Sequence, residues 1–122
     1  MFFMTKQSYS NRKYLRLLFL WRNMLKIQVN QKEDWCTVTF DGHAKYAPKG
    51  TDIVCSAVSS LYNTLYYVVL VDSTAKIESL SIGNNRQVLS ITELDDIAEK
   101  AINYFVKGCE LISNDYAEYV QI

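Results

Sequence analysis

The sequence predicts an α+β domain in which two helices pack on one face of a mainly antiparallel sheet, in the order ββαββαβ. Three observations predict it. Short stretches alternate apolar and polar residues, as strands with one buried face do. Two longer stretches repeat apolar residues at helical spacing. The strands come in pairs joined by short turns, which is typical of antiparallel hairpins, and 122 residues suffice for one domain.

The first predicted hairpin begins at Met24 and runs to the pair Asp41-Gly42. Residues 31–34 form a polar turn between its two strands. Every other residue in both strands is apolar, which gives each strand one buried face. These apolar residues are Leu25, Ile27 and Val29 in the first strand, and Cys36, Val38 and Phe40 in the second.

Residues 43–50 are predicted to form a loop, and Thr51 or Asp52 can cap the helix that follows it up to about Val71. Two apolar stripes cover much of the circumference of this helix, so we expect it to be central in the fold or part of an interface. The first stripe is Val54, Ala57, Val58, Leu61, Leu65 and Val68, and the second is Tyr62, Tyr66 and Val69.

The second half of the chain repeats the pattern of a hairpin followed by a helix. Residues 77–82 and 87–91 flank the turn sequence Gly83-Asn84-Asn85, and residues 92–95 read as a capping box that opens the second helix. Ser113-Asn114 is expected to end that helix, and residues 116–121 to form a short final strand. The core face of the helix is predicted to carry Leu94, Ile97, Ala98, Ala101, Ile102, Phe105 and Cys109.

Charge divides the chain into two parts. Residues 1–23 carry five basic residues and no acid, whereas the remainder carries eight basic and thirteen acidic residues, a net charge of 8 − 13 = −5. Such an acidic domain is a poor candidate for direct nucleic-acid binding but tolerates a basic protein partner. We interpret residues 1–23 as an extension outside the domain 24–122. It is either an amphipathic anchor or extra helix, or the product of an upstream start codon, and we favour the second alternative.

The longest apolar run of the extension, residues 17–21, lies between Arg16 and Arg22 and is too short to span a membrane. It also lacks the small-residue cleavage site of a secretion signal. Three cysteines without a CxxC pair, together with a single histidine, do not predict a zinc site or another metal or cofactor. We therefore expect a reduced, cytoplasmic protein without a membrane partner, in which Cys36 and Cys109 are buried core residues.

His43 and Cys55 are the candidate catalytic pair. His43 is expected at the end of the second strand, and Cys55 in the first turn of the first helix, twelve residues later. The free N–H groups and dipole of a helix N-terminus favour a thiolate and can stabilise an oxyanion. By spacing alone, a structural cysteine in a helix is the commoner alternative.

The residues around this pair closely resemble the signature of the ribosomal-processing cysteine proteases, the Prp family. The resemblance extends from Met24 to the C-terminus, and residues 1–23 lie outside it. Ser56 stands where the family usually has alanine, a mild change beside Cys55. The matching residues are Gly42-His43-Ala44, Tyr46-Ala47, Gly50, Asp52-Ile53-Val54-Cys55 and Ala57-Val58-Ser59.

The resemblance implies a bacterial endopeptidase that removes the N-terminal extension of large-subunit ribosomal protein twenty-seven, after paired phenylalanines, during ribosome maturation. It also implies a homodimer, and a loop between histidine and cysteine that becomes ordered over the substrate. Carried over by position, Cys55 would be the nucleophile and His43 the general base and acid.

The roles of four further residues stay open. Asp52 either orients His43 or caps the helix, and capping is favoured because aspartate is among the best N-caps. Gly42 and Gly50 are candidate hinges of a substrate lid. Ser59, one turn beyond Cys55, is a candidate near-site residue or an ordinary surface serine.

Two other functions compete with the protease. A non-catalytic ribosome-associated binding module with the same fold would carry an unreactive Cys55. A thiol redox sensor would need a second, resolving cysteine, and Cys36 and Cys109 are both expected in the core.

Overall fold

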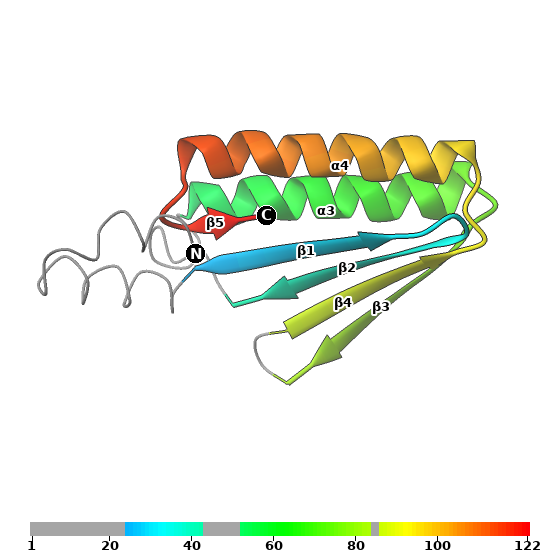
Figure 1. The fold of residues 1–122 in the computed structure, drawn as a ribbon, viewed down its shortest axis with the longest axis horizontal. Coiled ribbons are helices and arrows are strands. Elements are labelled where there is room, and N and C mark those ends of the chain that lie inside the picture. The colour runs from blue at the N-terminus through cyan, green and yellow to red at the C-terminus, as the bar shows by residue number, and fades with distance from the viewer. Residues whose placement is uncertain (1–23, 43–51, 84–85) are drawn as a thin grey trace, which may run out of the picture.

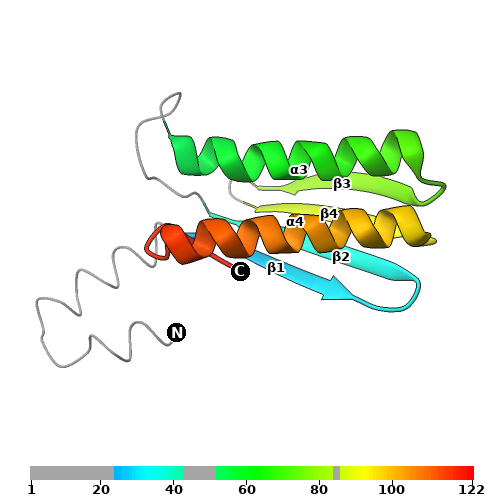
Figure 2. The ribbon, with the colours of Figure 1, turned by 90° about the horizontal axis from the view of Figure 1, so that it is seen from above.

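The computed structural model describes residues 24–42, 52–83 and 86–122, and within them it confirms the predicted order ββαββαβ. One five-stranded sheet, in the strand order β3-β4-β2-β1-β5, is covered on one face by two helices (Figure 1). Seen from above, α3 lies over the β3 side of the sheet (Figure 2). The elements are β1 Leu25–Gln31, β2 Trp35–Asp41, α3 Ile53–Asp72, β3 Lys76–Ile82, β4 Arg86–Thr92, α4 Asp96–Asp115 and β5 Val120–Gln121.

The sheet is antiparallel except at one edge, where β5 pairs with β1 in parallel. The final strand is shorter than predicted, because it contains only Val120 and Gln121 of residues 116–121. Tyr116 caps α4 through its N–H bond to the carbonyl of Ile112, and its own carbonyl accepts bonds from the N–H groups of Tyr119 and Val120. Residues 116–119 are therefore used to turn the chain from α4 into the sheet.

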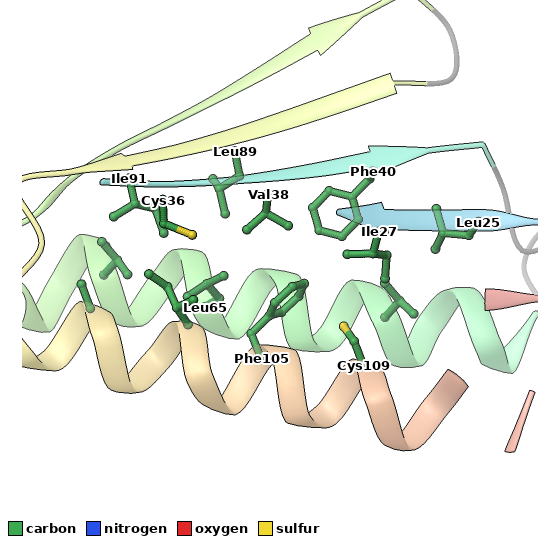
Figure 3. Close-up of a cluster of buried hydrophobic side chains, with 14 of the residues drawn as sticks. Leu25, Ile27, Cys36, Val38, Phe40, Leu65, Leu89, Ile91, Phe105 and Cys109 are labelled. Atoms are coloured by element: carbon green, nitrogen blue, oxygen red, sulfur yellow. The ribbon is translucent and has the colours of Figure 1, made fainter. Parts of the chain in front are cut away.

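The core lies between the sheet and the helices, as the alternation predicts (Figure 3). Cys36 and Val38 of β2 and Leu89 of β4 point into it from the sheet and are fully buried. Aromatic rings connect the sheet to both helices. The Phe40 ring of β2 packs edge-on against the Tyr62 ring of α3 and the Phe105 ring of α4, with ring centres 5.1 Å and 5.9 Å apart. Edge-to-face pairs of this kind add to the stabilisation from burial.

Of the two alternatives for the second stripe of α3, a central position or an interface, the structure supports the central position. Val69 is completely buried, and Tyr62 and Tyr66 are half-buried against the core. The hydroxyl groups of Tyr62 and Ser79 of β3 lie 2.6 Å apart, in hydrogen-bond contact. The sheet therefore covers this stripe, because the face that carries it is turned toward β3 and Phe40 rather than outward.

By length and apolar composition alone, α3 could cross a membrane. A helix that forms the core of a small domain has the same composition. Four residues of α3 are buried in this domain: Val54, Val58, Leu65 and Val69.

The start of α4 corrects the predicted capping box at residues 92–95. Thr92 is the last residue of β4, paired with Trp35 and Lys76, and α4 begins only at Asp96. Sheet pairing thus continues through Thr92, and Asp95 becomes the N-cap, accepting a bond from the Ala98 N–H at 2.8 Å.

The Asp95 carboxylate also binds the short connection between α3 and β3 to the start of α4. It accepts bonds from the Ser73 hydroxyl at 2.6 Å and from the Thr74 N–H at 2.9 Å. These hydrogen bonds, of which the bond from Ser73 has the largest effect, hold the pKa of Asp95 well below its usual range. Ile97, predicted on the core face, is exposed instead, one residue after the helix start.

Candidate active site

Cys55 lies in the first turn of α3, as predicted. Asp52 is the N-cap: its backbone is extended, and its Oδ1 accepts a hydrogen bond from the Cys55 N–H at 2.9 Å. Its carbonyl accepts from the Ser56 N–H at 3.0 Å. The predicted capping role of Asp52 is thus observed, and the thiol of Cys55 is exposed at the end of a capped helix.

A pocket of about 440 Å³ opens beside this thiol. It lies at the end of the molecule where α3 begins, β2 ends and β4 starts (Figure 1). Cys55 and Ser59 line it from α3, and Gly42 lines it from the end of β2. The other lining residues are Leu25, Phe40, Val58, Tyr62, Asn63, Ser81, Gly83, Arg86 and Gln87.

A hydrogen-bonded trio fixes one wall of this pocket. Gln87 of β4 donates from its side-chain amide to the Tyr62 hydroxyl at 3.0 Å and to the Ser79 hydroxyl at 2.8 Å. Because Tyr62 stands two helical turns beyond Cys55, these three side chains join α3 to β3 and β4 close to Cys55.

The rim of the pocket carries an ion pair. Arg86 Nη2 lies 3.5 Å from Asp41 Oδ2, and both side chains are about half exposed. Exposed pairs of this kind contribute little stability. The pair joins the end of β2 to the start of β4 on the strand position opposite Ile82.

The three cysteine thiols of the described residues differ sharply in their exposure to solvent. Cys55 is exposed, whereas Cys36 and Cys109 are completely buried, as predicted. Burial raises the pKa of Cys36 to about 11 and the pKa of Cys109 to about 12, because an apolar environment disfavours the charged thiolate. The two core thiols are thus kept protonated at neutral pH.

Alkylation should separate these thiols. We expect iodoacetamide at neutral pH to modify Cys55 in the folded protein, and to leave Cys36 and Cys109 unmodified until the protein is unfolded. Peptide mapping by mass spectrometry measures this. Equal labelling of all three in the native protein would show that the buried thiols are accessible.

The structure brings together several of the predicted site residues. Gly42, Cys55 and Ser59 line one pocket, and Asp52 holds the helix turn that carries Cys55. His43 and Gly50 lie outside the described residues, although Gly42, the residue before His43, is part of the pocket wall.

Gly42 is glycine for a structural reason. Its φ is +88°, and a side chain there would place a Cβ 2.6 Å from the carbonyl oxygen of Met24. A close approach of two backbones, not only a hinge, therefore requires glycine at this position.

Two substitutions at Asp52 distinguish capping from an additional role in catalysis. Asp52→Ala should lower the free energy of unfolding by about 0.5–2 kcal/mol, because the Cys55 N–H loses its acceptor. Asp52→Asn keeps an oxygen acceptor, so we expect near-wild-type thermal stability and kcat/KM within a few fold. If Asp52→Asn instead melts normally but loses most of its kcat, the carboxylate has a catalytic function.

The sequence did not single out Arg86, Gln87, Tyr62 or Ser81 as pocket residues. The available signal was the hairpin around Gly83, since its tip holds the end of one strand and the start of the next. Strand order decides where that tip lies, and pairing of β4 with β2 brings it beside the end of β2.

Comparison with known proteins gives a family and a fold. A family model described as cysteine protease Prp matches residues 24–121. No curated protein matches the sequence.

Similar folds occur among solved structures. The ribosomal processing protease Prp from S. aureus, in complex with a covalently linked product peptide, is 22% identical with a TM-score of 0.65, over 80% of this chain and 94% of that one. The same protease with a substrate peptide is 20% identical with a TM-score of 0.60, over 80% and 94%. A Streptococcus mutans protein is 22% identical with a TM-score of 0.61, over 81% and 91%. The family model spans the whole described domain, and the chain therefore belongs to the Prp family of cysteine proteases.

Proposed function

We propose that this protein is the cysteine endopeptidase that removes the N-terminal extension of large-subunit ribosomal protein twenty-seven during ribosome maturation. The observation that carries the proposal is the exposed Cys55 thiol at the capped start of α3, opening onto the pocket that Gly42 also lines. The S. aureus protease of similar fold is described as a ribosomal processing protease and binds peptides. The acidic charge of this domain suits a basic ribosomal protein.

The proposed reaction is acyl transfer through Cys55. The thiol proton passes to His43 as the sulfur attacks the carbonyl carbon of the scissile peptide bond. The tetrahedral intermediate collapses, the C–N bond breaks, and His43 returns the proton to the departing amine. Water then attacks the thioester, His43 takes a proton from that water, and the second collapse releases the carboxylic acid and the thiol.

Oxyanion stabilisation has fewer candidates than the helix N-terminus alone suggests. The Cys55 N–H already donates to the Asp52 carboxylate, and the Ser56 N–H donates to the Asp52 carbonyl. The amide of the Gln87 side chain serves the trio with Tyr62. These donors are already engaged, so the oxyanion would need other N–H or O–H donors that line the pocket.

Cleavage of the proposed substrate is a direct test. The full chain is incubated with the extended ribosomal protein, and intact-mass spectrometry reads the product. The expected result is a single cut that releases the extension, and no cut with Cys55→Ala protein. An unprocessed substrate with the wild-type enzyme would favour the non-catalytic binding module.

We further propose that residues 24–122 form the complete catalytic unit in the cytoplasm, and that residues 1–23 lie outside it. Support comes from the family match, which begins at Met24, and from the burial of Met24, which is 2% exposed at the entry to β1.

We also propose a homodimer, whose contact is the outer face of the helical layer. Tyr67 and Leu70 of α3 and Tyr104 and Leu111 of α4 are exposed there, and soluble monomers rarely display large apolar patches. Tyr104→Asp should convert dimer to monomer, because the interface would have to bury an unpaired carboxylate. Light scattering at tens of micromolar measures this.

Tyr66→Asp is the contrasting variant for the dimer prediction. Its side chain packs against the core, so this change should destabilise the fold instead of only dissociating the dimer. A wild-type protein that is monomeric under the same conditions would contradict the proposed contact.

A further inference from the structure

The strand β3 forms a long free edge of the sheet. Within the described residues it pairs only with β4, and no strand lies on its other side. Its pairing with β4 is continuous from Lys76 opposite Thr92 to Ile82 opposite Arg86, without a bulge. At the opposite edge, the two residues of β5 pair only with Leu25 and Lys26 of β1.

One end of this edge lacks the usual protection against strand addition. Natural edge strands carry charges, proline or bulges that prevent another strand from pairing with them. Lys76 and Glu78 supply charge at the start of β3. From Ser79 to Ile82 the sequence is Ser-Leu-Ser-Ile, with neither charge nor proline.

The two faces of this unprotected end have different chemistry. Ser79 faces the helices, because its hydroxyl contacts Tyr62 of α3. Side chains alternate along a strand, so Leu80 and Ile82 face the open side of the sheet, where they are 56% and 48% exposed. A strand added here would therefore place every second side chain beside two exposed apolar residues.

The unprotected end also leads into the candidate active site. Ser81 and Gly83 line the same pocket as Cys55. Lys76, at the charged start of β3, lies about 20 Å from Ile82, because each residue of an extended strand advances it by about 3.3 Å.

We propose that the substrate peptide binds as an added strand on the Ser79–Ile82 edge of β3, with apolar side chains at alternate positions beside Leu80 and Ile82. Main-chain hydrogen bonds then hold an extended segment on one side of the scissile bond, and the adjoining pocket receives the bond itself. This inference rests on the proposed protease function.

N-methylation of the substrate backbone tests the pairing with the unmodified enzyme. The parent is a synthetic peptide that spans the extension of ribosomal protein twenty-seven and its cleavage site, and a series carries one N-methyl group at each successive amide. Only alternate amides of an added strand donate to its neighbour. We expect kcat/KM to fall roughly 3- to 30-fold at every second position on one side of the scissile bond, with small effects between them.

Proline substitutions test the enzyme side of the pairing. Of two adjacent residues in an antiparallel edge strand, one points its N–H at the partner strand and the other points outward. We therefore compare Leu80→Pro with Ser81→Pro. The variant that keeps its thermal stability should show KM raised at least about tenfold with kcat largely retained. Lys76→Pro, at the charged far end of the strand, is the control and should retain KM within a few fold.

The outcomes separate the two proposals. An uncleaved parent peptide would overturn the protease function and, with it, the edge-binding inference. A parent that is cleaved while every N-methyl analogue reacts alike would overturn edge binding alone. A proline variant that becomes monomeric while its KM stays unchanged would instead assign the edge to pairing between two copies of the chain.

Discussion

Replacing Cys55 with alanine is expected to reduce cleavage by at least about four orders of magnitude, which brings it below detection in most assays. In the proposed mechanism this side chain supplies the sulfur atom that forms the acyl-enzyme, and no other exposed thiol is present among the described residues. His43→Ala should have a comparable effect, because nucleophile and base act as one unit. The measurement is the rate of product formation by quantitative mass spectrometry at saturating enzyme.

The control for this experiment is Cys109→Ala. It makes the same chemical change in the other helix, but at a completely buried position in the core. We expect a lower melting temperature and a normal rate per folded molecule, since the substitution leaves a small cavity. Circular dichroism should show that Cys55→Ala and His43→Ala proteins are folded. Near-wild-type turnover by either variant would refute the proposed dyad.

The buried faces of the strands could be predicted because alternation is a local property of the sequence. Cys36, Val38 and Phe40 are the buried residues of β2, as the two-residue period requires. The same logic correctly places Cys109 in the core from helical spacing. In each case the side chains follow the period of the backbone.

Element ends were less predictable, because tertiary contacts compete with local signals there. The residues 92–95 match a capping box, yet Thr92 gains pairing on both sides in the sheet. The cap therefore moves to Asp95, which also binds Ser73 and Thr74. These partners are more than twenty residues away in sequence, so no local pattern reveals them.

Some residues of the pocket could be predicted from local sequence, and others could not. The motif with Gly42, Asp52 and Cys55 is contiguous in sequence and points to the site directly. Gln87 and Ser79 enter the site only because β4 pairs with β2 and β3 pairs with β4. Strand order is a non-local property, and the alternation pattern carries no information about it.

The second large effect is expected from Gly42→Ala. The added Cβ would lie 2.6 Å from the Met24 carbonyl oxygen, and φ of +88° is unfavourable for any residue with a side chain. Backbone strain and overpacking together should lower the free energy of unfolding by roughly 2–4 kcal/mol. Urea denaturation measures this, and kcat/KM should fall as well, because Gly42 lines the pocket and precedes His43.

Gly83→Ala separates the two causes of that loss. Gly83 also has a positive φ, +64°, but a Cβ there would meet nothing within 4 Å. Its substitution should therefore cost only the torsional strain, about 1 kcal/mol. If both variants lose the same small amount of unfolding free energy, the backbone around Gly42 and Met24 can move apart at little cost, and Gly42 serves mainly as a hinge. A much larger loss at Gly42 would mean that contact between the start of β1 and the end of β2 holds the base of the pocket in place.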